Sequence, residues 1–343
     1  MKKHLNTLYV TTQGAYLFKD GETVAVKIDD ETRLRLPMHT LDGIICFGRV
    51  SCSPFLMGAC AERNVAISFL TANGRFMARV QGPVAGNVLL RREQYRKADN
   101  ASHTMAVSRA VLAGKLANSR TVLLRALRDH SKRIDPRRVE QAAVHISALL
   151  KQLDTHTAIN VIRGVEGDAA RTYFSVFDHL ITTNKDKFWF KGRNRRPPLD
   201  RVNCLLSFVY TLLLHDIRSA LECAGLDPAV GFLHRDRPGR PGLALDMMEE
   251  FRSSIGDRLV LSLINLGRVT AKGFKHRRNG AVLMDDDTRK KVLVTYQKRK
   301  QDEILHPFLE ERVPLGILFH TQALLMARYL RGELDGYPPF VWR

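Results

Sequence analysis

The stretch GNVLLRREQYR, residues 86–96, marks the point at which the hydrophobic pattern of this 343-residue chain changes. Before it, apolar and β-branched residues alternate in short runs, which is typical of strands with one buried face. From it onward, apolar residues recur at helical spacing. The sequence therefore predicts an α+β protein, with a small β-rich domain over residues 1–85 and a larger all-helical domain over residues 86–343.

The first domain is predicted to contain one short helix at 53–63 and strands at 7–11, 15–18, 23–28, 33–36, 43–48, 66–70 and 76–80. Asp20-Gly21 and Asn73-Gly74 each separate two of these runs and predict two-residue hairpin turns. Helices are predicted in the second domain at 86–97, 101–130, 136–153, 156–179, 200–224, 243–252, 254–268, 287–303 and 315–332.

The most apolar run is VNCLLSFVYTLLL, residues 202–214. It is too short to span a bilayer and is interrupted by polar side chains, so we interpret it as a buried core helix. The five cysteines form no C-x-x-C pair, and the N-terminus lacks the apolar core of a signal peptide. We therefore expect free thiols and a cytoplasmic protein.

The charge of the chain points to a polyanionic partner. It has 54 Lys and Arg against 35 Asp and Glu, a formal net charge of +19. The basic residues cluster at 184–201, where Phe188, Trp189 and Phe190 are interleaved with them, at 272–280 and at 289–300. One such cluster could equally be solvated surface, but three favour nucleic acid. The residues that we expect to contact DNA are Lys191, Arg193, Arg195, Arg196, Lys275, Arg277 and Arg278.

The segment FLHRDRPGRPGLALDMMEEFR, residues 232–252, places a histidine ahead of a loop and carboxylates on the helix that follows. Pro and Gly residues at 238–242 stop the helix from running back, so His234 lies on a separate segment that can fold over the helix. Asp246, Glu249 and Glu250 share one helix face. That face could be an ordinary wet acidic surface or, together with His234, a divalent metal site that lacks one ligand.

Glu166 is the candidate for the missing ligand. It lies at the edge of the apolar stripe of its helix, where a carboxylate must reach solvent, pair with a cation or bind a metal. Gly164 and Gly167 flank it, and each weakens the helix by about 1 kcal/mol relative to alanine. This arrangement indicates that another group approaches the backbone closely at this point.

Three stretches in register carry a family resemblance: GVEGDAARTYF (164–174), RPPLDRVNCLLSFVYTLL (196–213) and GLDPAVGFLHRDRPGRPGLALDMMEEFR (225–252). They resemble the CRISPR-associated integrase family, the universal spacer-acquisition subunit known as Cas protein one. The resemblance includes LYVTTQGAYL (8–17) and GELDGYPPFVWR (332–343). The latter, with GFKHRRNGAVLMDDDTRKKVL (273–293), is most similar to type I-C members.

The resemblance implies a site and a cofactor. Glu166, His234 and Glu249 match the family's ligands of Mg²⁺ or Mn²⁺, and Asp246 matches a nearby acid that is also needed for catalysis. Many members have aspartate where Glu249 stands. Glu250 and Asp285, Asp286 and Asp287 are not part of the pattern, and we interpret the triple acid as a helix N-terminal cap.

The resemblance also implies a reaction and partners. The 3′-OH of a short DNA fragment would attack a phosphodiester at the edge of a CRISPR repeat, in a direct transesterification without ATP. With water as the nucleophile, the same site would cleave DNA. The β-rich domain would form most of a homodimer, and two dimers would join the small second adaptation protein in a heterohexamer. The alternatives are a metal-dependent nuclease acting on branched DNA and a non-catalytic scaffold that binds nucleic acid.

Overall fold

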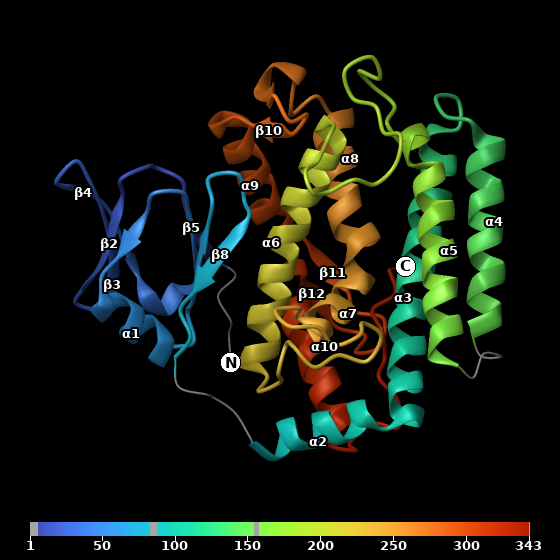
Figure 1. Cartoon of the computed structure of the whole chain (residues 1–343), viewed down its shortest axis with the longest axis horizontal. Coiled ribbons are helices and arrows are strands. Elements are labelled where there is room, and N and C mark those ends of the chain that lie inside the picture. Colours follow the sequence, from blue (N-terminus) through green and yellow to red (C-terminus); the bar gives the residue numbers. More distant parts are fainter. Residues whose placement is uncertain (1–5, 83–87, 154–157, 343) are drawn as a thin grey trace.

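The computed structural model describes residues 6–82, 88–153 and 158–342. Within the first range, the strands form two four-stranded sheets (Figure 1). One sheet has the order β1 (Asn6–Val10), β5 (Leu41–Phe47), β7 (Ala66–Leu70) and β8 (Phe76–Arg79). The other has the order β4 (Glu31–Pro37), β3 (Thr23–Ile28), β2 (Tyr16–Asp20) and β6 (Ser51–Cys52). Buried side chains from both sheets and from α1 (Pro54–Glu62) share one hydrophobic core.

The predicted hairpins exist, but their turns differ from the prediction. Asp20 pairs with Thr23, so the first two-residue loop is Gly21-Glu22, one position later than predicted. In the second, Thr71 N–H donates to the carbonyl of Arg75 over 2.7 Å, which leaves a three-residue loop. Gly74 has a φ of +85° there, the left-handed conformation that such loops place at their last residue. The Asn-Gly pair identified a hairpin without fixing its length.

The second region is mostly helical. Its helices are α2 (Val88–Asp99), α3 (Ala101–His130), α4 (Pro136–Gln152), α5 (Ile159–Ser175), α6 (Arg201–Cys223), α7 (Gly242–Phe251), α8 (Arg258–Asn265), α9 (Asp286–Lys300) and α10 (Leu315–Leu330). A π-helical turn (Arg252–Asp257) joins α7 to α8, and 3-10 turns occupy Met38–Thr40, Phe177–Leu180 and Ala271–Gly273. The α+β class is therefore confirmed. The predicted boundary at residues 85 and 86, and the predicted helix start at 156, lie outside the described residues.

Two short antiparallel hairpins interrupt the helices and were not predicted. They pair β9 (Phe274–His276) with β10 (Val282–Met284), and β11 (Glu303–Leu305) with β12 (Arg312–Pro314). Each strand has three residues, too few for alternation to be visible in the sequence. The predicted cap is confirmed, because Asp285 accepts from the backbone N–H of Thr288 at the start of α9 over 2.8 Å.

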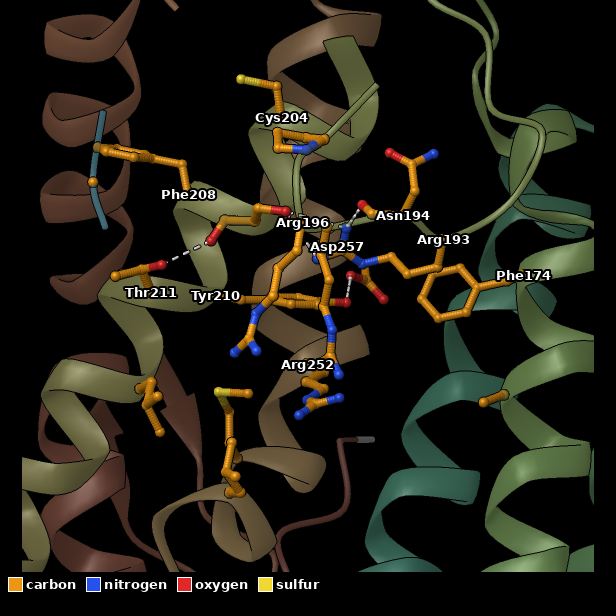
Figure 2. Close-up of a pocket in the computed structure, with 18 of the residues that line it drawn as sticks. Phe174, Arg193, Asn194, Arg196, Cys204, Phe208, Tyr210, Thr211, Arg252 and Asp257 are labelled. Carbon is orange, nitrogen blue, oxygen red and sulfur yellow. Dashed lines mark hydrogen bonds between the residues drawn. The ribbon is translucent and has the colours of Figure 1, made fainter. Parts of the chain in front are cut away.

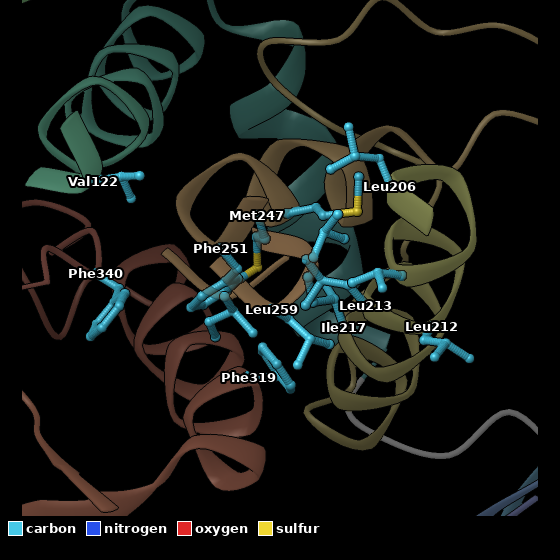
Figure 3. Close-up of a cluster of buried hydrophobic side chains, with 14 of the residues drawn as sticks. Val122, Leu206, Leu212, Leu213, Ile217, Met247, Phe251, Leu259, Phe319 and Phe340 are labelled. Atoms are coloured by element: carbon cyan, nitrogen blue, oxygen red, sulfur yellow. The ribbon is translucent and has the colours of Figure 1, made fainter. Parts of the chain in front are cut away.

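Helix α6 lies at the centre of the molecule, between the β-rich region and α7 and α10 (Figures 1 and 3). Among the described residues it is the one helix long and apolar enough to cross a membrane, by length and composition alone. Leu206, Leu213 and Ile217 are buried and pack toward Met247 and the rest of the helical core. The prediction of a buried core helix at this position is confirmed.

Candidate metal centre

Helix α7 is buried on all sides, and its acidic residues are buried with it. Asp246, Glu249 and Glu250 are 0%, 1% and 0% exposed. The interpretation of this face as a wet acidic surface is therefore wrong. Helices α3 and α6 pack on α7. The amphipathic pattern of the α7 sequence did not show that the polar face of this helix would also be covered by other helices. Each of these carboxylates consequently needs partners within the protein.

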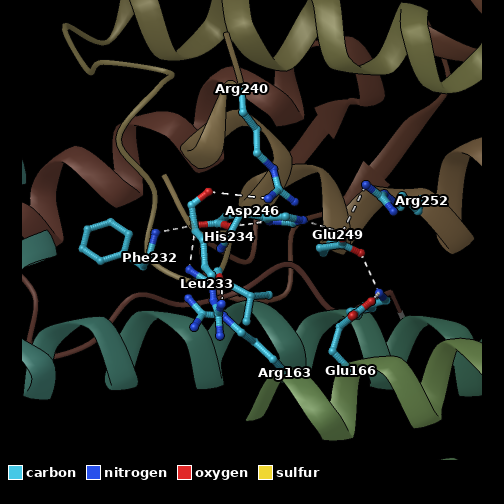
Figure 4. A network of polar contacts seen from close by, with 11 residues as sticks. Arg163, Glu166, Phe232, Leu233, His234, Arg240, Asp246, Glu249 and Arg252 are labelled. Carbon is cyan, nitrogen blue, oxygen red and sulfur yellow. Dashed lines mark hydrogen bonds and ion pairs between the residues drawn. The ribbon is translucent and has the colours of Figure 1, made fainter. Parts of the chain in front are cut away.

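Asp246 fixes the position of His234. One of its oxygens accepts from the backbone N–H groups of Phe232 and Leu233 over 2.6 and 3.0 Å. The other accepts from the backbone N–H of His234 over 2.9 Å and lies 2.6 Å from Nδ1 of its ring (Figure 4). A carboxylate at Nδ1 holds the proton there and leaves Nε2 free to act as a ligand. Asp246 is thus a positioning residue for the imidazole.

Glu249 lies one turn after Asp246 on α7. Its Oε1 is 3.8 Å from His234 Nε2 and 3.2 Å from a terminal nitrogen of Arg252. Burial opposes its charge, but Arg252, Lys115 and His234 lower its pKa to about 2. Glu249 is therefore ionised at neutral pH, as a metal ligand must be.

Helix α5 brings Glu166 to the same place. Its carboxylate forms an ion pair with the ammonium of Lys115 on α3, which also lies 2.8 Å from Oε2 of Glu249. The stripe beside Glu166 is buried as predicted. Outside the adjoining residues and the backbone of α5 itself, no described atom lies within 4 Å of a Cβ built on Gly164 or Gly167, so no other part of the described chain makes the predicted close approach.

The four predicted residues, Glu166, His234, Asp246 and Glu249, therefore converge from three separate segments. No group of three His, Cys, Asp or Glu side chains in residues 6–82, 88–153 and 158–342 is already gathered in metal-holding geometry. The residues present nevertheless fit a hard divalent cation. Oε2 of Glu249 is buried with the ammonium of Lys115 2.8 Å away, so a cation already stands at this oxygen, and two carboxylates with one imidazole suit Mn²⁺ or Mg²⁺.

Glu250 points the other way and has a structural role. It accepts hydrogen bonds from Tyr337 OH over 2.7 Å, from the Gln322 side-chain amide over 3.0 Å and from the backbone N–H of Phe340 over 2.7 Å. Burial raises its pKa to about 7. These contacts attach the C-terminal segment to α7, in agreement with the absence of Glu250 from the predicted ligand set.

Sequence reasoning missed two cations of the site, Lys115 and Arg252. Lys115 stands within the apolar run of α3, next to the buried Leu116, and its side chain is only 11% exposed. A lysine in the apolar stripe of a helix must find an anion, so the same argument that identified Glu166 could have identified Lys115. Coulombic attraction by Glu249 and Glu166 outweighs the burial penalty and raises the pKa of Lys115.

A second missed group is a cluster of arginines beside His234. Arg163, one turn before Glu166, donates to the carbonyl of Leu233 over 2.8 Å. Arg163 and Arg235 share the side-chain oxygen of Asn160, and Arg240 lies 3.5 Å from the carbonyl of Arg235. Within the described part of the chain, Arg163, Arg235 and Arg240 form no ion pair with an acid. Burial and the neighbouring Arg235 lower the pKa of Arg163.

The carboxylates of Glu166 and Glu249 also line a cavity of about 1410 Å³. The hairpin between β7 and β8 and the segment 193–198 line it, together with α3, α5, α6 and α7 (Figure 2). Tyr210 OH donates to Asp257 over 2.6 Å, and the guanidinium groups of Arg193 and Arg252 lie 5.3 and 5.5 Å from the centre of the Tyr210 ring. The cavity thus joins the carboxylates to a wall of arginine and aromatic side chains.

The predicted DNA contacts fall into two groups. Lys191, Arg195, Arg196, Lys275, Arg277 and Arg278 are exposed. Arg193 is half-buried and donates to Asn203 over 2.8 Å and to Ser207 over 3.2 Å, so its guanidinium already has protein partners. Phe188 and Phe190 are buried in the core, and among the three interleaved aromatic residues Trp189 alone can stack on a base. In the third basic cluster, Arg289 and Lys300 are buried in ion pairs with Asp286 and Asp216.

A family model described as CRISPR associated protein Cas1 matches residues 8–298 of the chain. The chain belongs to the Cas1 family. Full-length Cas1 relatives support this: the CRISPR-associated endonuclease Cas1 1 of Chlorobaculum tepidum is 60% identical over all of both chains. The CRISPR-associated endonuclease Cas1 2 of Rhodospirillum rubrum is 51% identical, again over all of both chains.

Solved structures share the fold of this Cas1 chain. A casposase bound to integration product has a TM-score of 0.84 at 22% identity and covers 98% of this chain and 94% of its own. A Cas1 protein from Thermotoga maritima has a TM-score of 0.80 at 21% identity, with 95% and 97% covered. A Cas6-RT-Cas1–Cas2 complex has a TM-score of 0.83 at 20% identity, over all of this chain and 36% of the other.

Proposed function

We propose that this Cas1 chain is a divalent-metal-dependent DNA integrase of CRISPR adaptation. It would join the 3′-OH ends of short DNA fragments to the CRISPR repeat by transesterification. The observation that carries the proposal is the convergence of Glu166, His234 and Glu249 beside arginines that have no acidic partner among the described residues. The curated relatives are named endonucleases, and one structure with this fold is a casposase bound to integration product. We infer that this chain is likewise an enzyme acting on DNA.

Glu166, Glu249 and Nε2 of His234 would hold Mg²⁺ or Mn²⁺. When bound, the metal supplies Lewis-acid activation of the scissile phosphate and favours deprotonation of the attacking hydroxyl. Asp246 keeps the Nδ1 proton of His234 in place, so that Nε2 remains an acceptor. Arg252 lies beside Glu249 and faces the cavity, where it can hold a phosphate oxygen. With water in place of the 3′-OH, the same residues would support endonuclease cleavage.

The arginines and exposed lysines would hold the DNA backbone and give a binding that weakens with salt. We also propose that the region of residues 1–85 forms most of a homodimer, and that two dimers assemble with the small second adaptation protein. The exposed edge strand β4, with Leu34 39% exposed, and the exposed Phe55 on α1 support an interface there. A Cas6-RT-Cas1–Cas2 complex and a TtCas1–DNA complex share the fold.

We further assign the chain to the type I-C group, on its segments 273–293 and 332–343, and to the cytoplasm. The five cysteines all lie in the described residues and form no disulfide, and four of them are buried, as expected for a reducing compartment.

A strand-transfer assay tests the proposal. It combines the purified chain, the small second adaptation protein, a labelled duplex with free 3′-OH ends and a repeat-bearing plasmid, with Mn²⁺, Mg²⁺ or EDTA. We expect metal-dependent joining that falls at least 100-fold in Glu166→Gln, because a metal ligand is lost. Asp168→Asn is the matched control on the same helix, since Asp168 pairs with the half-exposed His145 over 2.9 Å. Nicking without joining would favour the nuclease, and binding without either reaction would favour the scaffold.

A further inference from the structure

The ammonium of Lys115 lies where the two carboxylates of the candidate metal centre meet. Its side chain is 11% exposed, and that of Glu249 is 2% exposed. Lys115 Nζ contacts Glu166 and lies 2.8 Å from the buried Oε2 of Glu249. A metal held by Glu166 and Glu249 would need the carboxylate oxygens that Lys115 now neutralises.

The charges of the four side chains around this contact cancel, and the carboxylate of Asp246 is already engaged by three backbone N–H groups and His234. Two carboxylates, Glu166 and Glu249, face two cations, Lys115 and Arg252. A divalent ion added to this neutral set brings two positive charges without counter-ions, in a place where burial makes unpaired charge costly. A DNA phosphodiester supplies negative charge at the same point. The charges of the site are therefore better balanced when metal and phosphate are both bound than when the metal is bound alone.

We propose that Lys115 is a resident counter-cation that competes with the divalent metal for Glu166 and Glu249. When metal takes the two carboxylates, the Lys115 ammonium loses both partners and pairs with a DNA phosphate. Metal and DNA consequently bind cooperatively, and each raises the affinity of the other by the same factor. This inference rests on the proposed function, because it requires a metal at Glu166 and Glu249.

Binding of Mn²⁺, measured by titration calorimetry and by the electron paramagnetic resonance signal of free Mn²⁺, tests the inference without an activity assay. Titrations are made on the full chain with and without a short DNA duplex. In Lys115→Met the carboxylates keep their charge and lose the competing cation. We expect Mn²⁺ to bind this variant at least tenfold more tightly than the wild type when DNA is absent. DNA should raise Mn²⁺ affinity severalfold in the wild type, and by a smaller factor in Lys115→Met.

Lys300→Met is the matched control. Lys300 is also buried and lies 3.1 Å from Asp216 on α6 and 3.3 Å from the hydroxyl of Thr7 on β1. Its loss should leave Mn²⁺ affinity unchanged. Lys115→Gln also removes the competing charge but keeps a hydrogen-bond donor beside the carboxylates, so it should tighten Mn²⁺ binding in the same way, which keeps the test valid if Lys115→Met folds poorly.

Equal or weaker Mn²⁺ binding by Lys115→Met, in a wild type that does bind Mn²⁺, would overturn the role of Lys115 and leave the proposed function intact. Equal tightening in Lys300→Met would also overturn it, because the effect would then be a general loss of positive charge. Failure of the wild type to bind Mn²⁺ with or without DNA would remove both the inference and the metal centre.

Discussion

At the scale of single residues, Asp246 depends on a close contact between two glycines. A Cβ on Gly231 would lie 2.6 Å from the carbonyl carbon of Gly242 and 2.7 Å from Oδ2 of Asp246. A Cβ on Gly242 would lie 2.6 Å from the carbonyl oxygen of Ala229. Only glycine lets the loop pass this close to the start of α7, and this passage aims the N–H groups of residues 232–234 at Asp246.

We expect Gly231→Ala to lower the free energy of unfolding by about 1–3 kcal/mol, because backbone atoms must move to admit the methyl group. Urea unfolding measures the change. Gly164→Ala is the control, since its Cβ meets no described atom within 4 Å beyond its own helix and alanine favours the helix by up to about 1 kcal/mol. Equal stability of Gly231→Ala and the wild type would show that the loop does not need this close approach.

At the scale of elements, α5 and the loop before α7 form one unit. Arg163 on α5 donates to the carbonyl of Leu233, so the helix that carries Glu166 holds the segment that carries His234. Arg163 and Arg235 share the side-chain oxygen of Asn160, and Arg240 lies 3.5 Å from the carbonyl of Arg235, so the three arginines follow the edge of the site that carries His234. Their charges repel one another, and an anion bound among them would be strongly favoured.

The double variant Arg235→Ala and Arg240→Ala should bind DNA less tightly and with a weaker salt dependence. The slope of log K against log salt concentration should fall by about 0.9 for each DNA phosphate that the variant no longer neutralises, hence by one to two units. Fluorescence anisotropy over a range of salt concentrations measures the slope. The control removes Arg328 and Arg331, which both pair with Glu333 after α10. A double variant with the wild-type slope would exclude a phosphate site at this edge.

At the scale of the whole molecule, α6 joins the β-rich region to the helices. Its His215 is half-buried, and Nδ1 of the ring lies 3.1 Å from Ser68 Oγ on β7. Burial lowers the pKa of His215 to about 4, although the neighbouring Asp216 acts in the opposite direction. Lys300, Arg218 and Arg79 add to the lowering. The neutral imidazole is therefore part of the packing between the two regions.

His215 makes the stability of the folded chain fall in mild acid. The unfolded chain binds a proton at His215 with a pKa near 6.5 and the folded chain only near 4, so protons favour unfolding between these values. Lowering the pH from 6.5 to 4.5 should cost about 2 kcal/mol through this group. Urea unfolding of the wild type and of His215→Gln at both pH values measures the difference. The prediction fails if both proteins lose the same stability.

Asp257 has the opposite effect on folding stability over part of this pH range. Burial raises its pKa to about 6, even though Tyr210, Tyr173 and Arg193 favour its charged form. The folded chain then holds a proton at Asp257 that the unfolded chain releases, and this contribution to stability is lost as the pH rises from about 4 to 6. The comparison of wild type with His215→Gln removes this effect, because Asp257 is present in both.

The periodicity of the sequence determined the α+β class and nearly every helix, because a helix or strand with one buried face must repeat its apolar residues at a fixed spacing. It also singled out Glu166, His234 and the acidic residues of 246–250 as candidates, because a carboxylate at an apolar edge and a histidine beside a helix break are unusual locally, whereas the choice of Glu249 among those acids came from the family resemblance. The turn lengths, the three-residue strands and the parallel pairing of β1, β5 and β7 were not predicted, since these depend on how distant segments meet.

Only the tertiary structure decided what surrounds these residues. It buried the acidic face of α7, assigned Glu250 to the C-terminal segment and directed Asp246 to His234 rather than to a ligand position. It placed Lys115 of α3 between carboxylates from α5 and α7. Spacing along the chain shows which side chains share a face of one helix or strand. Which charged side chains of other elements lie against that face, and how deeply they are buried, depends on how the elements pack together.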